Sequence, residues 1–160
     1  MWSCAYLNGF AIHVSSTTSL RNSVVYGSLG IHNLEPGVRQ RYFDAYTAMI
    51  DSGIRGTRNS GACAIDMTMI ARGCGDAMFQ FGQHVWDTAA AELVVTEAGG
   101  VVCDPSLEVD ERRQMETAVG KCRLKTFDPM SRRVLVAATV SLATELAAVI
   151  PEVEVERDGN

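Results

Sequence analysis

The sequence predicts an α/β fold in which helices flank a largely parallel or mixed sheet. Short β-rich segments alternate along the chain with apolar segments of helical period, which is the order expected of a layered α/β protein. A helix predicted over residues 86–98 stands between two strand-like segments and ends at Gly99-Gly100, where glycine accepts the left-handed conformation that terminates helices. No internal repeat is evident, so one layered unit accounts for the whole pattern.

Turn, capping and period signals justify the elements in chain order. Asn8-Gly9 is a turn signal of the kind that joins two strands, Pro36 suits the first turn of a helix, and Ser141 can cap another. We expect strands or extended segments at 10–15, 23–29, 55–59, 76–81, 101–103 and 134–138, helices at 36–53, 62–73, 86–98 and 142–150, and a short edge strand at 152–156.

Apolar spacing also predicts the buried face of three helices. For the helix at 36–53 this face consists of Val38, Tyr42, Tyr46, Met49 and Ile50. For the helix at 86–98 it consists of Ala89, Ala90, Leu93, Val94 and Ala98. For the last helix it includes Leu142, Leu146 and Val149.

One segment departs from the regular pattern. Nine of the 21 residues from Pro105 to Lys125 are charged and follow no clean period, so we expect an exposed loop that can be mobile. With 160 residues, the chain is long enough for one domain or for half of a larger one.

Composition limits the classes of function. Hydrophobic residues make up 47% of the chain and charged residues 21%, which favours a packed core over disorder. The net charge of -5 argues against a nucleic-acid partner, but it permits an anionic substrate because bound metal ions can reverse the local charge. Five cysteines without zinc-type spacing predict reduced thiols and a cytoplasmic location. The apolar stretch 134–150 is shorter than the about 20 residues of a membrane span, and the amino-terminal residues do not resemble a signal peptide.

Two helix starts are candidate parts of a binding site. Asp87 lies in the first turn of the helix at 86–98, where the helix dipole favours a carboxylate and free amides can help to hold an anion. The alternative is an ordinary N-cap, whose loss costs about 1 kcal/mol. Small residues at Gly61, Ala62 and Cys63 let backbone amides approach a ligand closely, although a tight strand–helix turn explains them equally well.

The stretch WDTAAAELVVTEAGG at 86–100 closely resembles the second signature of the inositol monophosphatase family, whose members are magnesium-dependent, lithium-sensitive phosphomonoesterases. Residues 58–100, 127–134 and 156–158 are similar to further segments of the family's carboxyl-terminal part. The resemblance implies the carboxyl-terminal half of a layered αβαβα sandwich, with a mixed sheet flanked by helices. It also implies hydrolysis of myo-inositol monophosphate and a homodimer as the full-length form.

The resemblance assigns roles to individual residues. Mg²⁺ ions held by carboxylates are the family's catalytic groups. Asp87 matches the aspartate that binds a metal and meets the inositol hydroxyls, and the segment Gly61, Ala62 and Cys63 matches one that contacts substrate. Gln80 stands where the animal enzymes usually have a glutamate that hydrogen-bonds the inositol ring. Trp86 is expected to be a packing anchor and His84 a structural histidine.

The chain also lacks expected motifs. The family's first signature, Asp-Pro-x-Asp-Gly-Thr, and the preceding Gly-Glu-Glu do not occur in the sequence. Because these motifs supply most metal ligands in the family, we expect a fragment or truncated isoform, with little activity as the isolated chain. Two alternatives stay open: a non-catalytic family remnant that pairs with or regulates a full-length enzyme, and a related sugar or nucleotide phosphatase, which the amide of Gln80 permits.

Overall fold

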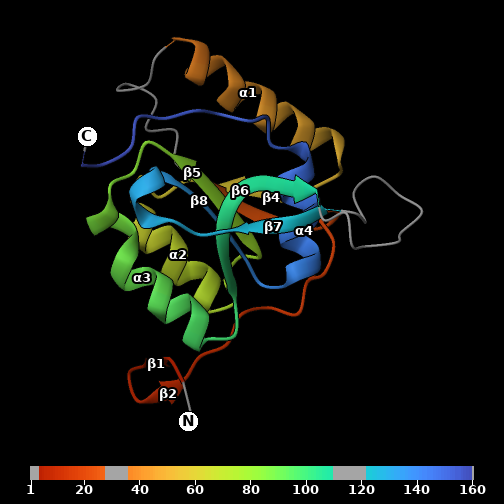
Figure 1. Ribbon diagram of the computed structural model, residues 1–160. Helices are drawn as coiled ribbons and strands as arrows, with labels where there is room; N and C mark the ends of the chain where they lie inside the picture. Colours follow the sequence, from red (N-terminus) through yellow and green to blue (C-terminus); the bar gives the residue numbers. More distant parts are fainter. Residues whose placement is uncertain (1–3, 28–35, 110–121, 160) are drawn as a thin grey trace.

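The computed structural model describes residues 4–27, 36–109 and 122–159. The strands are β1 (Tyr6–Leu7), β2 (Phe10–Ala11), β3 (Val24–Gly27), β4 (Gly56–Arg58), β5 (Ala77–Phe81), β6 (Val101–Val109), β7 (Cys122–Thr126) and β8 (Arg133–Ala137). The helices are α1 (Pro36–Asp51), α2 (Cys63–Ala71), α3 (Val85–Glu97) and α4 (Val140–Val149), with a short 3-10 helix at Pro129–Ser131. Figure 1 shows their arrangement.

Six of the strands form one mixed sheet. Their order is β4-β3-β5-β8-β6-β7. Strands β4, β3 and β5 run parallel, whereas β8 pairs antiparallel with both β5 and β6, and β6 pairs antiparallel with β7. The remaining strands, β1 and β2, form a separate hairpin. The predicted fold class, a mixed sheet flanked by helices, is therefore confirmed.

The sheet separates two hydrophobic clusters, so the molecule has three layers. Along β5, Phe79 and Phe81 pack in a cluster with residues of α1 and α4, whereas Met78 packs in a cluster with residues of α2 and α3. This alternation is the period of two that puts successive strand residues on opposite faces. Figure 1 shows α2 and α3 side by side at the lower left, on the opposite side of the sheet from α4. No helix in the described part of the chain has the length and apolar character needed to cross a membrane.

The turn and cap signals correctly located several junctions. Asn8 and Gly9 have φ of 52° and 84°, as a two-residue hairpin turn requires, although β2 ends at Ala11 rather than at residue 15. Pro36 begins α1, and Gly99 follows α3 with φ of 89°. For α4, however, the N-cap is Thr139, whose Oγ1 accepts a hydrogen bond from the backbone N of Leu142 at 3.2 Å; the prediction of Ser141 was wrong.

The predicted helix faces are only partly correct. In α1, Tyr42 and Met49 are buried as expected, but Ile50 is 63% exposed. In α3 the buried stripe consists of Thr88, Ala91, Val95 and Ala98, whereas the predicted face residues Ala89, Ala90 and Leu93 are exposed. Small residues surround this helix on several sides, so the apolar pattern does not define one face, and packing against α2 decides which side is buried.

The prediction of a loop over residues 105–125 is wrong at both ends of that range. Strand β6 continues through Pro105 to Val109, and β7 begins at Cys122. The register between β6 and β7 shifts between Asp104 and Leu107, which accommodates the proline in a bulge. Residues 110–121 lie outside the described residues. The predicted edge strand at 152–156 is also absent, because backbone carbonyls of this segment accept hydrogen bonds from arginine side chains instead of from a strand.

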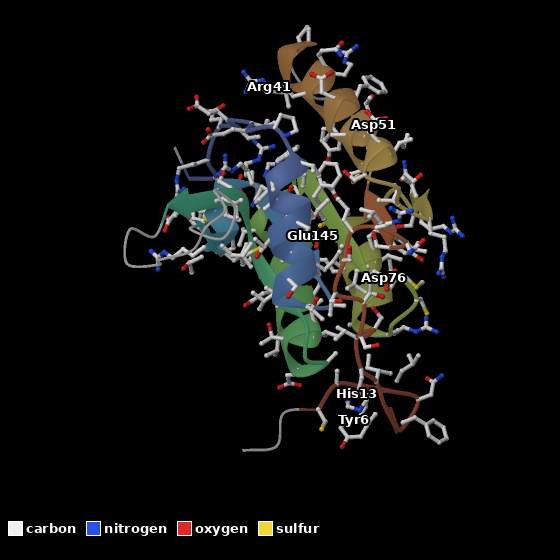
Figure 2. All side chains as sticks on the ribbon, turned by 90° about the vertical axis from the view of Figure 1, so that its right-hand side faces the viewer. Tyr6, His13, Arg41, Asp51, Asp76 and Glu145 are labelled. Atoms are coloured by element: carbon white, nitrogen blue, oxygen red, sulfur yellow. The ribbon has the colours of Figure 1, made fainter. Side chains whose placement is uncertain are left out.

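Two carboxylates fix the segment that leads from the β1–β2 hairpin to β3 (Figure 2). Asp76 accepts hydrogen bonds from the hydroxyls of Ser15 and Thr17 at 2.6 and 2.7 Å and from the backbone N of Val24 at 2.7 Å. Glu145 on α4 accepts a hydrogen bond from the backbone N of Leu20 at 2.6 Å. Acidic side chains therefore attach this irregular segment to the layered core.

Candidate functional site

Two helices begin at the same edge of the parallel part of the sheet. Strands β3, β4 and β5 run in one direction, and α2 follows β4 while α3 follows β5. The N-termini of both helices therefore lie at the carboxyl edge of these strands. Open α/β sheets bind ligands at such an edge, where helix N-termini present free amides.

Asp87 lies in the first turn of α3 and is half-buried. Its Oδ2 accepts a hydrogen bond from the backbone N of His84 at 2.9 Å, so the carboxylate does contribute to capping the helix. Among the described residues, nothing donates a hydrogen bond to Oδ1. One oxygen thus holds the helix start and the other is available to a ligand.

The start of α2 supplies unsatisfied backbone donors. Gly61 has φ of 82°, a conformation that glycine adopts without strain. Ala62 is the N-cap and has no side-chain acceptor to offer the first amides of α2, whereas its own backbone N donates to the Ser60 hydroxyl at 3.3 Å. Burial, and then the charges of Asp87 and Asp66, raise the pKa of the Cys63 thiol to about 12. The thiol is protonated at neutral pH and is not a thiolate nucleophile.

Gln80 is the second-last residue of β5, and its side chain lies on the face of the sheet that α2 and α3 cover. It lies two residues after Met78, whose side chain packs with those helices, and strand residues two apart share a face. Its Oε1 is buried and has no hydrogen-bond partner within the described part of the chain. A buried acceptor without a donor is costly unless a ligand or water supplies one.

Asp66 on α2 is a residue that the sequence-based prediction missed. It is fully buried, and neither carboxylate oxygen has a hydrogen-bond partner among the residues that the structure describes. Burial raises the pKa of Asp66, and the nearby Ser60 lowers it by less. The available signal was its spacing, because Cys63, Asp66 and Ile70 lie at i, i+3 and i+7 on the buried face of α2.

Trp86 does not pack in the core, so its prediction as an anchor was wrong. Its side chain is 73% exposed and stacks on the ring of His84, with centroids 4.5 Å apart. His84 is held by Asp158, whose carboxylate lies 2.7 Å from Nδ1. His84 therefore has the structural role expected of it, and its partner is 74 residues away in the sequence.

The site is an open edge rather than a closed metal centre. Within residues 4–27, 36–109 and 122–159, no three His, Cys, Asp or Glu side chains are grouped so that they can hold a metal ion. Three hollows on the described surface border Glu152 instead, and none of them is lined by Asp87, Gln80 or residues 61–63.

Sequence comparison identifies relatives of the whole chain. The profile of the Inositol monophosphatase family matches residues 1–154. The chain belongs to this family. Inositol monophosphatase 1 of Mus musculus is 30% identical over 154 residues, which cover 96% of this chain and 49% of the mouse protein. Inositol monophosphatase of Dictyostelium discoideum is 36% identical over 102 residues, covering 64% of this chain and 37% of that protein.

Solved structures of the inositol monophosphatase family share the fold. The extragenic suppressor protein suhB of Bartonella henselae matches with a TM-score of 0.72 and 21% identity, covering 92% of this chain and 48% of that one. Inositol monophosphatase of Anabaena matches with a TM-score of 0.67 and 21% identity, covering 90% and 50%. The chain therefore spans about half the length of the family members that it matches.

Replacing Asp66 with asparagine is expected to stabilise this inositol monophosphatase-family chain. Because burial raises the pKa of Asp66 in the folded state, folding takes up a proton, and stability falls as pH rises from the unfolded pKa toward the folded one. Asp66→Asn removes that loss, so we expect the free energy of unfolding at pH 7 to rise. Urea unfolding at pH 5 and pH 7 measures the gain, which is expected to be smaller at pH 5.

Asp76→Asn is the matched control, and the change in stability expected for it has the opposite sign. Burial favours a raised pKa for Asp76, but hydrogen bonds from Ser15, Val24 and Thr17 outweigh it, so the pKa is lowered. Asp76 then contributes stability above its unfolded pKa that is lost as pH falls through its folded pKa. Asp76→Asn is expected to destabilise the chain at pH 7. An equal loss for both variants would show that Asp66 has a hydrogen-bond partner.

Gly27 is the last residue of β3, and its lack of a side chain lets the ring of Tyr46 pack against it. The Tyr46 hydroxyl donates a hydrogen bond to the Gly27 carbonyl at 3.1 Å, and a Cβ at residue 27 would lie 2.6 Å from that hydroxyl. We expect Gly27→Ala to displace the Tyr46 ring and to destabilise the fold by about 1–3 kcal/mol. Urea unfolding tests this, with Tyr46→Phe as the comparison. If Gly27→Ala costs nothing in either background, the close packing is not present in solution.

Proposed function

We propose that this chain supplies the substrate-binding edge of a magnesium-dependent phosphomonoesterase that hydrolyses myo-inositol monophosphate to inositol and phosphate. The observation that carries the proposal is Asp87, which stands at a helix N-terminus with one oxygen unpaired among the described residues. The names of the mouse and Dictyostelium relatives support the substrate class. The proposed role of the enzyme is inositol recycling for phosphatidylinositol signalling, in the cytoplasm.

The proposed ligand groups come from three elements. Asp87 binds a metal ion and accepts hydrogen bonds from inositol hydroxyls. The amides of Gly61, Ala62 and Cys63 donate to the anionic or hydroxyl oxygens of the substrate. The unpaired Oε1 of Gln80 accepts a further hydroxyl, without the charge that a carboxylate would add.

The described residues do not hold Mg²⁺ on their own. Magnesium prefers six oxygen ligands in near-octahedral geometry, and these residues present no cluster of three suitable side chains. We propose Asp87 as one ligand of a site whose other ligands lie outside the described residues. Lithium inhibition and a homodimeric full-length form are expected to accompany the activity.

The experiment is a chimera in which this chain replaces the matching 49% of mouse inositol monophosphatase 1. Phosphate release from myo-inositol 1-phosphate is measured with and without Mg²⁺, beside the unmodified mouse protein. We expect magnesium-dependent release. A chimera that is monodisperse and melts cooperatively, but releases no phosphate from this ester, would overturn the proposed function. Phosphate release from a sugar phosphate and from a nucleotide bisphosphate, measured in the same way, decides whether Gln80 changes the substrate preference.

A further inference from the structure

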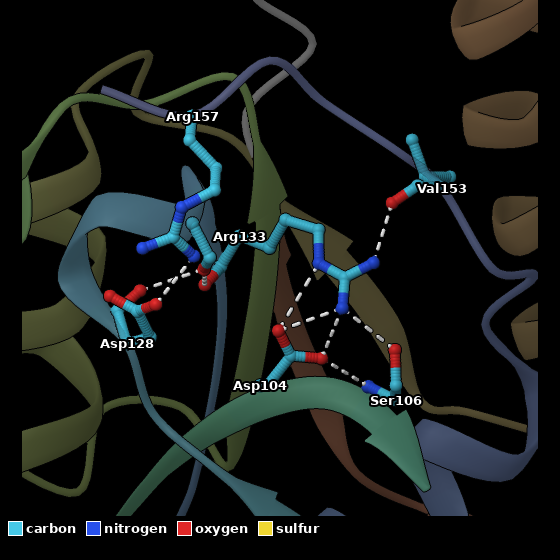
Figure 3. Close-up of polar contacts among 7 residues, drawn as sticks. Asp104, Ser106, Asp128, Arg133, Val153 and Arg157 are labelled. Atoms are coloured by element: carbon cyan, nitrogen blue, oxygen red, sulfur yellow. Dashed lines mark hydrogen bonds and ion pairs between the residues drawn. The ribbon is translucent and has the colours of Figure 1, made fainter. Parts of the chain in front are cut away.

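The described chain ends in a strap, residues 151–158, that has no helix or strand. Arginine side chains from α1 and from the start of β8 hold its backbone. Arg41 of α1 donates to the carbonyl of Glu152, Arg133 of β8 donates to the carbonyl of Val153 at 2.7 Å, and Arg132 donates to the carbonyl of Glu156 at 3.4 Å. Figure 3 shows the contact to Val153 and the pairing of Arg157 with Asp128 at 2.6 Å.

The strap ends on the first turn of α3. Asp158 pairs with Nδ1 of His84 at 2.7 Å and accepts a hydrogen bond from the backbone N of Val85 at 3.0 Å. Its own backbone N donates to the carbonyl of Met130 at 3.0 Å. A carboxylate at this position satisfies an otherwise free amide and interacts favourably with the helix dipole. Only 13% of the Asp158 side chain is exposed, so the contact is well packed.

An arginine also holds the same turn. Arg132 donates to the carbonyl of Gly82 at 2.8 Å, while the backbone N of Gly82 donates to the carbonyl of Arg132 at 2.8 Å. The Nε of Arg132 lies 3.8 Å from the Asp158 carboxylate. Arg132 has a left-handed backbone conformation, with φ of 57°, at the end of the short 3-10 helix. The turn from Gly82 to Val85 is therefore fixed by residues far away in the sequence.

This turn also positions Asp87. The backbone N of His84 donates to Asp87 Oδ2, and the His84 ring is held by Asp158 on one edge and by Trp86 on one face. When the ring is neutral, donation from Nδ1 to Asp158 fixes one tautomer and leaves Nε2 unprotonated. A continuous set of contacts thus runs from Asp158 through His84 to the carboxylate of Asp87.

We propose that Asp158 and His84 are positioning residues, through which the strap fixes the turn that presents the free oxygen of Asp87. Asp158 acts through His84 and touches no substrate. The functional part of this inference rests on the proposed role of Asp87. The mechanical part, that the strap orders the start of α3, is independent of any activity and can be tested alone.

The test compares the full chain with Asp158→Ala by NMR. Asp51→Ala is the matched control, because Asp51 is an exposed acid on a different element, at the end of α1 (Figure 2). We expect Asp158→Ala to speed hydrogen exchange of the Val85 amide at least about tenfold, to change the ring nitrogen shifts that report the His84 tautomer, and to shift the Asp87 amide signal. Asp51→Ala is expected to change none of these.

The result that overturns the proposal is an Asp158→Ala chain that is less stable overall but keeps the wild-type His84 tautomer and Asp87 signal. That outcome would make the strap a stabilising element only. A titration of both chains with myo-inositol 1-phosphate separates this inference from the proposed function. If the parent chain binds none, the proposed function fails, while the exchange and tautomer measurements still decide the role of Asp158.

Discussion

The largest loss of stability is expected from Arg133→Met. Arg133 Nη2 donates to the two oxygens of Asp104 at 2.6 and 2.8 Å and to the Ser106 hydroxyl at 2.9 Å (Figure 3). Its Nε donates to Asp104 at 3.1 Å, and its Nη1 donates to the carbonyl of Val153 at 2.7 Å. The two charged side chains are 10% and 2% exposed. Removing the arginine leaves the Asp104 charge buried, which costs about 3–5 kcal/mol of unfolding free energy.

A double variant separates the charge from the packing. Asp104→Leu combined with Arg133→Met removes both charges, so we expect it to be clearly more stable than Arg133→Met alone. Glu108→Gln is the matched control, because Glu108 pairs with Arg123 at 2.7 Å with both side chains well exposed. That variant is expected to cost less than about 1 kcal/mol. If urea unfolding gives equal losses for Arg133→Met and Glu108→Gln, the pair is not buried in solution.

The largest loss of activity is expected from Asp87→Asn. In the active chimera, we expect the substitution to lower kcat by at least about 100-fold, because a lost metal and substrate contact removes several kcal/mol of transition-state stabilisation. Asparagine retains an oxygen that can accept the hydrogen bond from His84, so the cap and the melting temperature are expected to change little. Steady-state phosphate release and thermal unfolding are measured on the same preparation.

Glu92→Gln is the matched control for Asp87→Asn, because it removes a carboxylate from the same helix away from its first turn. It is expected to leave kcat unchanged. This pair of variants distinguishes Asp87 as a metal and substrate ligand from Asp87 as an ordinary helix cap. If Asp87→Asn lowers stability but keeps the turnover of the parent chimera, Asp87 is only a helix cap.

The elements that the sequence predicted well are those with local causes. Asn8-Gly9 encodes a hairpin turn and Pro36 a helix start, whatever surrounds them. Strand β5 and helix α3 were predicted because β-rich and helical segments differ in period. The buried face of α3 was not predictable, because Ala89, Ala90 and Ala91 differ little in apolar surface and contact with α2 decides which of them is buried.

Features that depend on distant partners escaped prediction. Strand β6 extends past Asp104 by pairing with β7, and Arg133, 29 residues away, binds the Asp104 carboxylate. The segment at 152–156 is not a strand because its backbone carbonyls accept hydrogen bonds from arginine side chains of α1 and β8. In the candidate site, Asp87 stood within a recognisable sequence stretch, whereas the pairing of His84 with Asp158 requires the folded chain.

The most direct test of the account is a titration of the ¹⁵N-labelled 160-residue chain with myo-inositol 1-phosphate, beside Asp87→Asn. The account predicts saturable shifts of the amides at the starts of α2 and α3, namely residues 61–63 and 84–87, and at least about tenfold weaker binding by Asp87→Asn. The account is contradicted if these amides do not shift, if Asp87→Asn binds equally well, or if the shifts are confined to the hollow lined by Arg133 and Arg157.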